Sequence, residues 1–371
     1  MKIKINETQY MTLTEEAGVP TNVVDIARQI YDKIMSTIKP NIDLEDFLDN
    51  EIILKGNFQI NDFNFSKINV GFQVDDLNDF NLKGKDIKAL VLGMAHRGTV
   101  EFAKNFNYTV TNEPNKVNLF INVAVNDETT TQDLIDDFKK ERVVMVSSLS
   151  HELKHAYDES VYKKVETPGR VNYSIGSERS FGNIQPINEF IKFMYFAHTT
   201  ENLVRPTELY AMLDELGISR EDFYKFITSN STYQTYKKGS QFTYEYLREE
   251  LLKVIPEIKE TFDNNNIDYP KNLSDKDMVD FTLMEFYDTL KNWKAGIMNR
   301  MLTTEFMETF MGFQGKKKEY FEKYLKSISR FDEDYEQFFR YETKQINHIC
   351  LKMTKKISKI FSLIKNKNPQ D

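Results

Sequence analysis

The feature that most constrains the fold is a change in the spacing of apolar residues along the chain. Between residues 51 and 125 apolar residues tend to alternate with polar ones, as in FNFSKINVGFQV (63–74), KALVLGMAHRG (88–98) and VNLFINVAV (117–125). This period of two is typical of strands. From Glu141 onwards the apolar residues recur every three or four positions, which indicates helices. The sequence therefore predicts an α+β fold, in which a small mixed or antiparallel sheet precedes a mostly helical C-terminal half.

Three consecutive segments are expected on this basis: a helical lead-in at 1–50, a domain with the sheet at 51–220 and a helical domain at 221–371. The stretch ETPGRVNYSIGSERSFGN, between residues 159 and 184, carries Gly, Ser and Pro and predicts a loop. After it, PTELYAMLDELG predicts a helix that ends at Gly217.

Composition excludes several classes of protein. The 371 residues are 40% hydrophobic, which is enough for a substantial core. A net charge of −8 argues against a protein whose main function is binding nucleic acid. No apolar run approaches the roughly 18 residues of a membrane span, and the first residues lack the apolar stretch of a secretory signal, so a cytoplasmic location is expected. The single cysteine, Cys350, excludes an internal disulfide and a thiolate cluster for zinc.

Residues 150–159 are SHELKHAYDE and contain His151, Glu152 and His155 as His-Glu-x-x-His. In a chain with 5 His and 57 acidic residues, this pattern arises by chance roughly 0.01 times. Thr130 and Asp133 predict a capping box, and therefore a helix start, shortly before it. Apolar residues at helical spacing mark one face of the following helix: Met145, Leu149, Leu153 and Ala156. The two histidines, four residues apart, share another face of that helix.

This spacing suits a catalytic zinc ion. Two imidazoles one helical turn apart, His151 and His155, can both reach a single zinc, and a third protein ligand with one open position completes the site. Glu152 would then act as general base on a water that the zinc activates. Zinc is favoured, although nickel, cobalt or iron accept similar ligands.

SHELKHAYDE resembles the active-site helix of the zincin metallopeptidases, including the small Ala after the second His and the hydrophobic residue after the Glu. The order of sheet, metal helix and helical subdomain is also similar to that superfamily. The resemblance implies that 51–220 is a zincin-like domain and that the protein hydrolyses peptide bonds. It also implies that VNLFINVAV binds substrate as an added strand, as the sheet edge does in zincins.

The resemblance further indicates a third ligand. In metzincins this is a His six residues after the second His, and the region here, ESVYKK, contains none. RPTELYAML (205–213) resembles the Pro-x-Glu-x-x-Ala pattern of gluzincin-like bacterial and phage proteins, which implies Glu208 as the third zinc ligand. Pro206 at a helix start would aim Glu208 at the metal helix. Met212 departs from that pattern in two respects. In related proteins an Arg often follows the Ala, and an acidic residue often stands four positions after the ligand.

Other residues are further candidates for roles in the metal site. Weaker ligand candidates are Glu189, His198 and Glu201. Asp158 and Asp214 are candidates for supporting the ligands. Candidates for stabilising an oxyanion are Arg205, Tyr157, Tyr173 and Tyr210.

Two functions from different classes are expected. The first is a zinc-dependent endopeptidase, with Zn²⁺ as cofactor and a peptide or protein as substrate, acting in the cytoplasm. The second is a structural or interaction protein of a tailed-phage virion that retains a zincin-like domain. The opening MKIKINETQYMTL resembles the Ile-x-Glu-x-Gln leaders of phage reading frames. In that case the C-terminal helices would contact the assembly partners.

Overall fold

A computed structural model describes the following residues of the chain: 19–20, 22–61, 63–79, 89–97, 100–102, 108–110, 115–162, 181–197, 199–301 and 334–364. The chain divides into two compact units, and each draws on separate stretches of sequence. Unit 1 lies within 1–165, 203–226 and 356–371, and unit 2 lies within 166–202 and 227–355. The boundaries predicted at residues 50 and 220 stay predictions. The predicted loop lies almost wholly outside the described residues.

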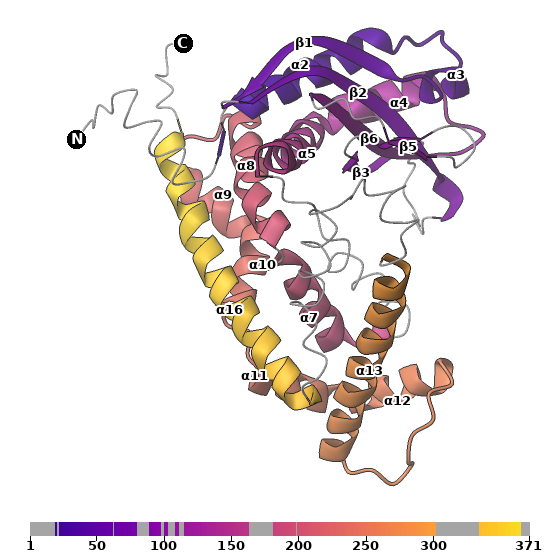
Figure 1. The fold of residues 1–371 in the computed structure, drawn as a ribbon, viewed down its shortest axis with the longest axis vertical. Coiled ribbons are helices and arrows are strands. Elements are labelled where there is room, and N and C mark those ends of the chain that lie inside the picture. The colour runs from indigo at the N-terminus through magenta and orange to yellow at the C-terminus, as the bar shows by residue number, and fades with distance from the viewer. Residues whose placement is uncertain are drawn as a thin grey trace. The chain divides into compact units, whose positions relative to one another are not determined.

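Unit 1 contains a four-stranded mixed sheet with the strand order β1-β2-β6-β3 (Figure 1). The strands are β1 (Ile52–Ile60), β2 (Phe63–Asp76), β3 (Leu90–Arg97) and β6 (Lys116–Val125). β1 and β3 run antiparallel to their neighbours, whereas β2 and β6 are parallel. A separate antiparallel pair joins β4 (Val100–Phe102) to β5 (Tyr108–Val110). All three alternating segments therefore form strands, and the α+β class is confirmed.

β6 lies inside this sheet and not at its edge. Its residues pair with β2 on one side and with β3 on the other, so that neighbouring strands take its backbone hydrogen bonds. Side chains on both faces of β6 are largely buried, which is typical of a central strand. The expectation that VNLFINVAV receives a substrate as an added strand is therefore wrong. In the four-stranded sheet, β3 occupies the edge next to β6.

Two helices cover the sheet of unit 1. α2 (Asn22–Thr37) and α5 (Arg142–Tyr162) pack against each other and against the strands, α2 on β1 and α5 on β3 and β6. Every second residue of β6 contributes to the core, namely Val117, Leu119, Ile121 and Val123. The other helices with residues in this unit are α3 (Leu44–Leu48), α4 (Thr131–Lys140), α8 (Thr199–Glu215), α9 (Phe223–Ser229) and the last residues of α16 (Tyr335–Lys359). Short 3₁₀ turns follow β2 and α16, at Leu77–Asp79 and Ile360–Leu363.

Unit 2 is helical. Its elements are α7 (Gln185–Phe196), α10 (Ser231–Gly239), α11 (Tyr244–Lys253), α12 (Ile255–Asn264), α13 (Asp275–Met301) and most of α16 (Tyr335–Lys359). Phenylalanines from separate helices form its core. The ring centroids of Phe190 and Phe339 lie 5.3 Å apart, as do those of Phe181 and Phe286. Such aromatic contacts add to the free energy gained from burying the rings. No helix in the described part of the chain is long and apolar enough to span a membrane.

The close approach of α10 to α16 in unit 2 leads to a stability prediction. A Cβ at Gly239 would lie 2.6 Å from Cys350 Sγ and 3.4 Å from Phe193 Cδ1. Cys350 is fully buried, so its side chain has little room to move. We expect Gly239→Ala to lower the free energy of unfolding by about 1–3 kcal/mol through overpacking. Urea unfolding followed by the fluorescence of Trp293, the only tryptophan and a residue of unit 2, measures the change.

A second variant separates this clash from a general intolerance of Ala. Cys350→Ala removes the sulfur that the new methyl group would meet, so Gly239→Ala should cost less in the Cys350→Ala background than in the wild type. Equal costs in the two backgrounds would contradict the overpacking explanation.

Candidate metal and catalytic site

The helix that carries the His-Glu-x-x-His pattern forms as the sequence predicts. The Thr130 hydroxyl accepts a hydrogen bond from the Asp133 backbone N–H, and the Asp133 carboxylate accepts from the Thr130 backbone N–H, which is a capping box at the start of α4. α5 follows directly. The predicted apolar face of α5 is buried at all four positions: Met145, Leu149, Leu153 and Ala156. This packing fixes the rotation of α5 and thus the direction of its neighbouring face.

The two histidines of α5 direct the same ring nitrogen toward each other. His151 and His155 are both buried, and their Nε2 atoms lie 3.1 Å apart. Two nitrogens bound to one tetrahedral zinc at 2.0–2.1 Å would be about 3.3–3.4 Å apart. The spacing of the two Nε2 atoms therefore fits two ligands of a single ion.

Glu152 lies near the Nε2 edge of the His151 ring, which is also the edge that faces His155. Its Oε1 is 3.8 Å from His151 Nε2, and its side chain is 14% exposed. A carboxylate in this place is near any group held between the two Nε2 atoms, yet solvent can still reach it.

Glu208 approaches His151 from the other edge of the imidazole ring. Its Oε2 lies 3.0 Å from His151 Nδ1 and accepts a hydrogen bond of 2.7 Å from Arg205 Nη1. Burial by itself raises the pKa of the Glu208 carboxyl, but the charges and hydrogen bonds of Arg205 and His151 outweigh it and lower the pKa from 4.5 to about 2. Glu208 is therefore ionised at neutral pH.

The helix that carries Glu208 starts earlier than expected. α8 begins at Thr199, so Pro206 lies inside the helix and does not mark its start. A proline at this position removes one hydrogen bond to the preceding turn, and the helix continues through it. Glu208 consequently lies in the middle of α8. The helix ends as predicted, with Gly217 in the left-handed conformation at φ 61°.

The structure places most of the other candidates, and Tyr210 among them is buried on α8. Asp158 accepts from the Lys154 ammonium, and Asp214 pairs with Arg28, so both carboxylates already have cationic partners. Tyr157 accepts a hydrogen bond from Asn61 in unit 1, and Glu189 lies on α7 in unit 2. Three candidates fall outside what the structure describes: His198, Tyr173 and the side chain of Glu201.

As placed, the described side chains do not complete a metal site. Among them, no three His, Cys, Asp or Glu residues are arranged so that they could jointly hold an ion. His151 and His155 supply two converging nitrogens, whereas Glu208 contacts the opposite edge of one ring. The contact between Arg205 and Glu208 was not predicted, although a basic residue three positions before an acidic one on a helix is a signal for such a pair.

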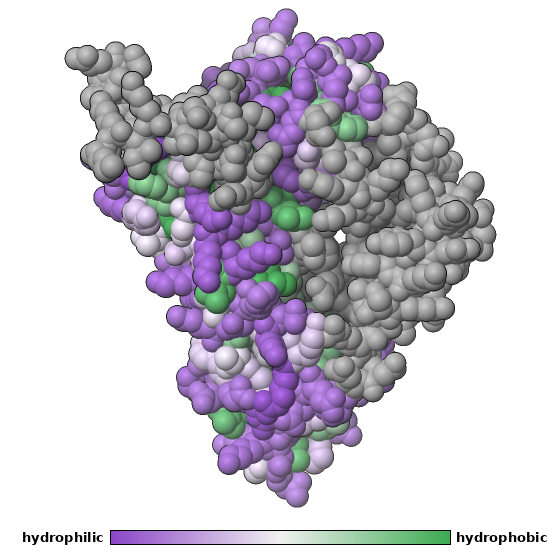
Figure 2. Space-filling view, turned by 60° about the vertical axis from the view of Figure 1, so that its left-hand side comes forward, coloured by the Kyte–Doolittle hydropathy of each residue, from purple (hydrophilic) through white to green (hydrophobic). Residues whose placement is uncertain are grey.

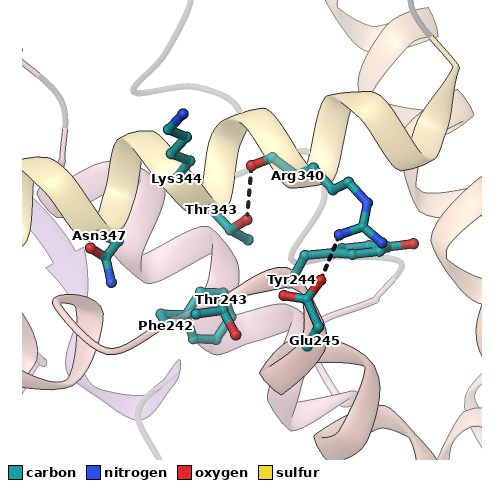
Figure 3. A pocket seen from close by; sticks show the side chains of 8 residues that line it. All are labelled: Phe242, Thr243, Tyr244, Glu245, Arg340, Thr343, Lys344 and Asn347. Atoms are coloured by element: carbon teal, nitrogen blue, oxygen red, sulfur yellow. Dashed lines mark hydrogen bonds and ion pairs between the residues drawn. The ribbon is translucent and has the colours of Figure 1, made fainter.

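A depression of about 290 Å³ lies on unit 2, away from these residues in sequence (Figure 3). It is lined by Phe242, Thr243, Tyr244, Glu245, Arg340, Thr343, Lys344 and Asn347. The guanidinium of Arg340 is paired with Glu245 at 2.5 Å and with Glu336 at 2.9 Å. Its charge is thus largely balanced by these two carboxylates.

Comparisons with protein-family profiles, with curated proteins and with solved structures returned no match.

Proposed function

We propose that the protein is a zinc-dependent metallopeptidase in which His151 and His155 bind the metal and Glu152 is the general base. One observation carries the proposal: the Nε2 atoms of the two histidines converge at 3.1 Å, and the Glu152 carboxylate lies beside them. Unit 1 supports a zincin-like interpretation, because a helix bearing these residues packs against a small mixed sheet. Glu208 as the third ligand stays a prediction from the resemblance.

Each side chain has a defined task in this proposal. When bound, zinc would lower the pKa of a water molecule and polarise the scissile carbonyl. Glu152 takes the proton of the attacking water as the oxygen adds to the carbonyl carbon, and it returns the proton to the amine nitrogen as the C–N bond breaks. His151 and His155 would each offer the lone pair of one ring nitrogen to the metal. The substrate class is a peptide or protein.

The test is the zinc content of purified protein, supplied with zinc and then dialysed. We expect about one zinc per chain in the wild type and its loss in His155→Ala, because a catalytic site needs its histidine ligands. His348→Ala is the matched control, since His348 is exposed on α16. Circular dichroism establishes that each variant is folded. A wild type that binds no zinc, or a His155→Ala variant that keeps its zinc, would contradict the proposal.

The alternative is an assembly protein of a phage virion. Such a protein should present a large exposed apolar patch for its partners. On the face drawn in Figure 2, the described side chains are mostly hydrophilic and the hydrophobic ones form small separate areas. This observation does not favour the alternative. For catalysis the alternative makes the opposite prediction: the protein would cleave no peptide, even if it bound zinc.

A further inference from the structure

The two ring nitrogens of His151 face different partners. Nε2 is directed toward His155 Nε2 at 3.1 Å, and Nδ1 toward Glu208 Oε2 at 3.0 Å. A metal shared with His155 must lie on the Nε2 edge of the ring. To bind the same ion, the Glu208 carboxylate would have to leave the Nδ1 edge and move around the ring.

Two contacts hold the carboxylate where it is. Arg205, one turn earlier on α8, donates to the same oxygen that faces His151 Nδ1. The side chains of Arg205 and Glu208 are 15% and 17% exposed, so this ion pair is largely shielded from water. Breaking such a pair is costly, because it leaves a poorly solvated charge without its partner.

The contact with Glu208 has a consequence for His151. Glu208 Oε2 already accepts from Arg205 Nη1 and lies 3.0 Å from His151 Nδ1, so it pairs with this nitrogen as an acceptor and Nδ1 is the nitrogen that donates. In a neutral imidazole, Nε2 then keeps its lone pair for a metal. Carboxylates that accept from the second nitrogen of a ligand histidine fix its tautomer and orientation and raise its basicity.

We infer that Glu208 is a positioning residue, which holds His151 through Nδ1 and is itself held by Arg205, and that it is not a ligand of the metal. The inference rests on the proposed function for the metal that His151 binds. In this arrangement Arg205 holds Glu208, Glu208 holds His151, and His151 binds the metal. It replaces the role of third ligand that the resemblance implies for Glu208.

The first test needs no metal. In ¹⁵N-histidine-labelled apoprotein, the ring nitrogen shifts of His151 should show Nδ1 protonated and Nε2 unprotonated in the wild type. In Glu208→Ala the protonated fraction should move toward Nε2, whereas it should not move in Glu221→Ala, whose Glu is exposed in unit 1. A wild-type His151 protonated at Nε2 only, or one unaffected by Glu208→Ala, would overturn the inference.

The second test uses the protein loaded with zinc or with cobalt. X-ray absorption should find the same number and type of atoms bound directly to the metal in the wild type and in Glu208→Ala, and the cobalt absorption bands should keep their intensity. Metal affinity should fall about 10–100-fold, as for loss of an outer carboxylate. Loss of one oxygen bound directly to the metal would make Glu208 a ligand and overturn the inference, while the proposed function would stand. A wild type that binds neither metal would overturn the proposed function, and the nitrogen shifts would still decide whether Glu208 holds His151.

Discussion

Replacing Glu152 with Gln is expected to lower the rate of peptide hydrolysis by about 10²–10⁴-fold while zinc content stays unchanged. The amide of Gln has nearly the same shape as the carboxylate but cannot take a proton from water. Glu152 Oε1 lies 3.8 Å from His151 Nε2, so the substitution changes a group beside the two histidines and not one of the two nitrogens that we propose as metal ligands. The loss should therefore fall on kcat and leave KM nearly unchanged.

The measurement is cleavage of a library of internally quenched peptides by the zinc-loaded protein. Glu221→Gln, a change of the same kind at an exposed position of unit 1, should cleave like the wild type. If Glu152→Gln loses its zinc, the residue is acting as a ligand and the general-base assignment fails. If the wild type binds zinc but cleaves no peptide, the structural alternative gains support.

Local sequence patterns predicted the elements of the fold because their physical causes are local. The capping box of Thr130 and Asp133 depends on residues three apart, and the buried face of α5 depends on a repeat of three and four. The place of β6 in the sheet depends instead on its pairing with β3, a strand that precedes it in the chain. Alternation along 117–125 could identify a strand but not its neighbours, and the edge position was accordingly wrong.

The candidate site also combines features that depend on nearby residues with features that depend on tertiary packing. His151, Glu152 and His155 lie within one helical turn, so their mutual geometry follows from the helix itself. Glu208 is 57 residues from His151, and its approach to Nδ1 depends on how α8 packs in unit 1. The position of Pro206 was misjudged because proline favours the first turn of a helix but is tolerated further inside when the residues before it are also helical.

Asp158→Ala is expected to destabilise α5 by about 3–5 kcal/mol, independently of any metal. Lys154 Nζ lies 2.5 Å from both carboxylate oxygens of Asp158, and the two side chains are only 8% and 10% exposed. Removing the carboxylate leaves the Lys154 ammonium buried without this partner. Hydrogen exchange of peptides covering residues 142–162 measures the loss as faster exchange, and confines the measurement to unit 1.

Removing both charges together distinguishes a buried ion pair from a solvated one. Lys154→Met/Asp158→Leu removes both charges of the pair, and apolar side chains replace them in a buried place, so the double variant should lose much less protection than Asp158→Ala. The ammonium also lies 5.4 Å from the centre of the Tyr157 ring, a contact that the double variant gives up. If Asp158→Ala costs less than about 1 kcal/mol, the pair behaves like an exposed one. Water or another neighbouring group must then stabilise the ammonium in the absence of Asp158.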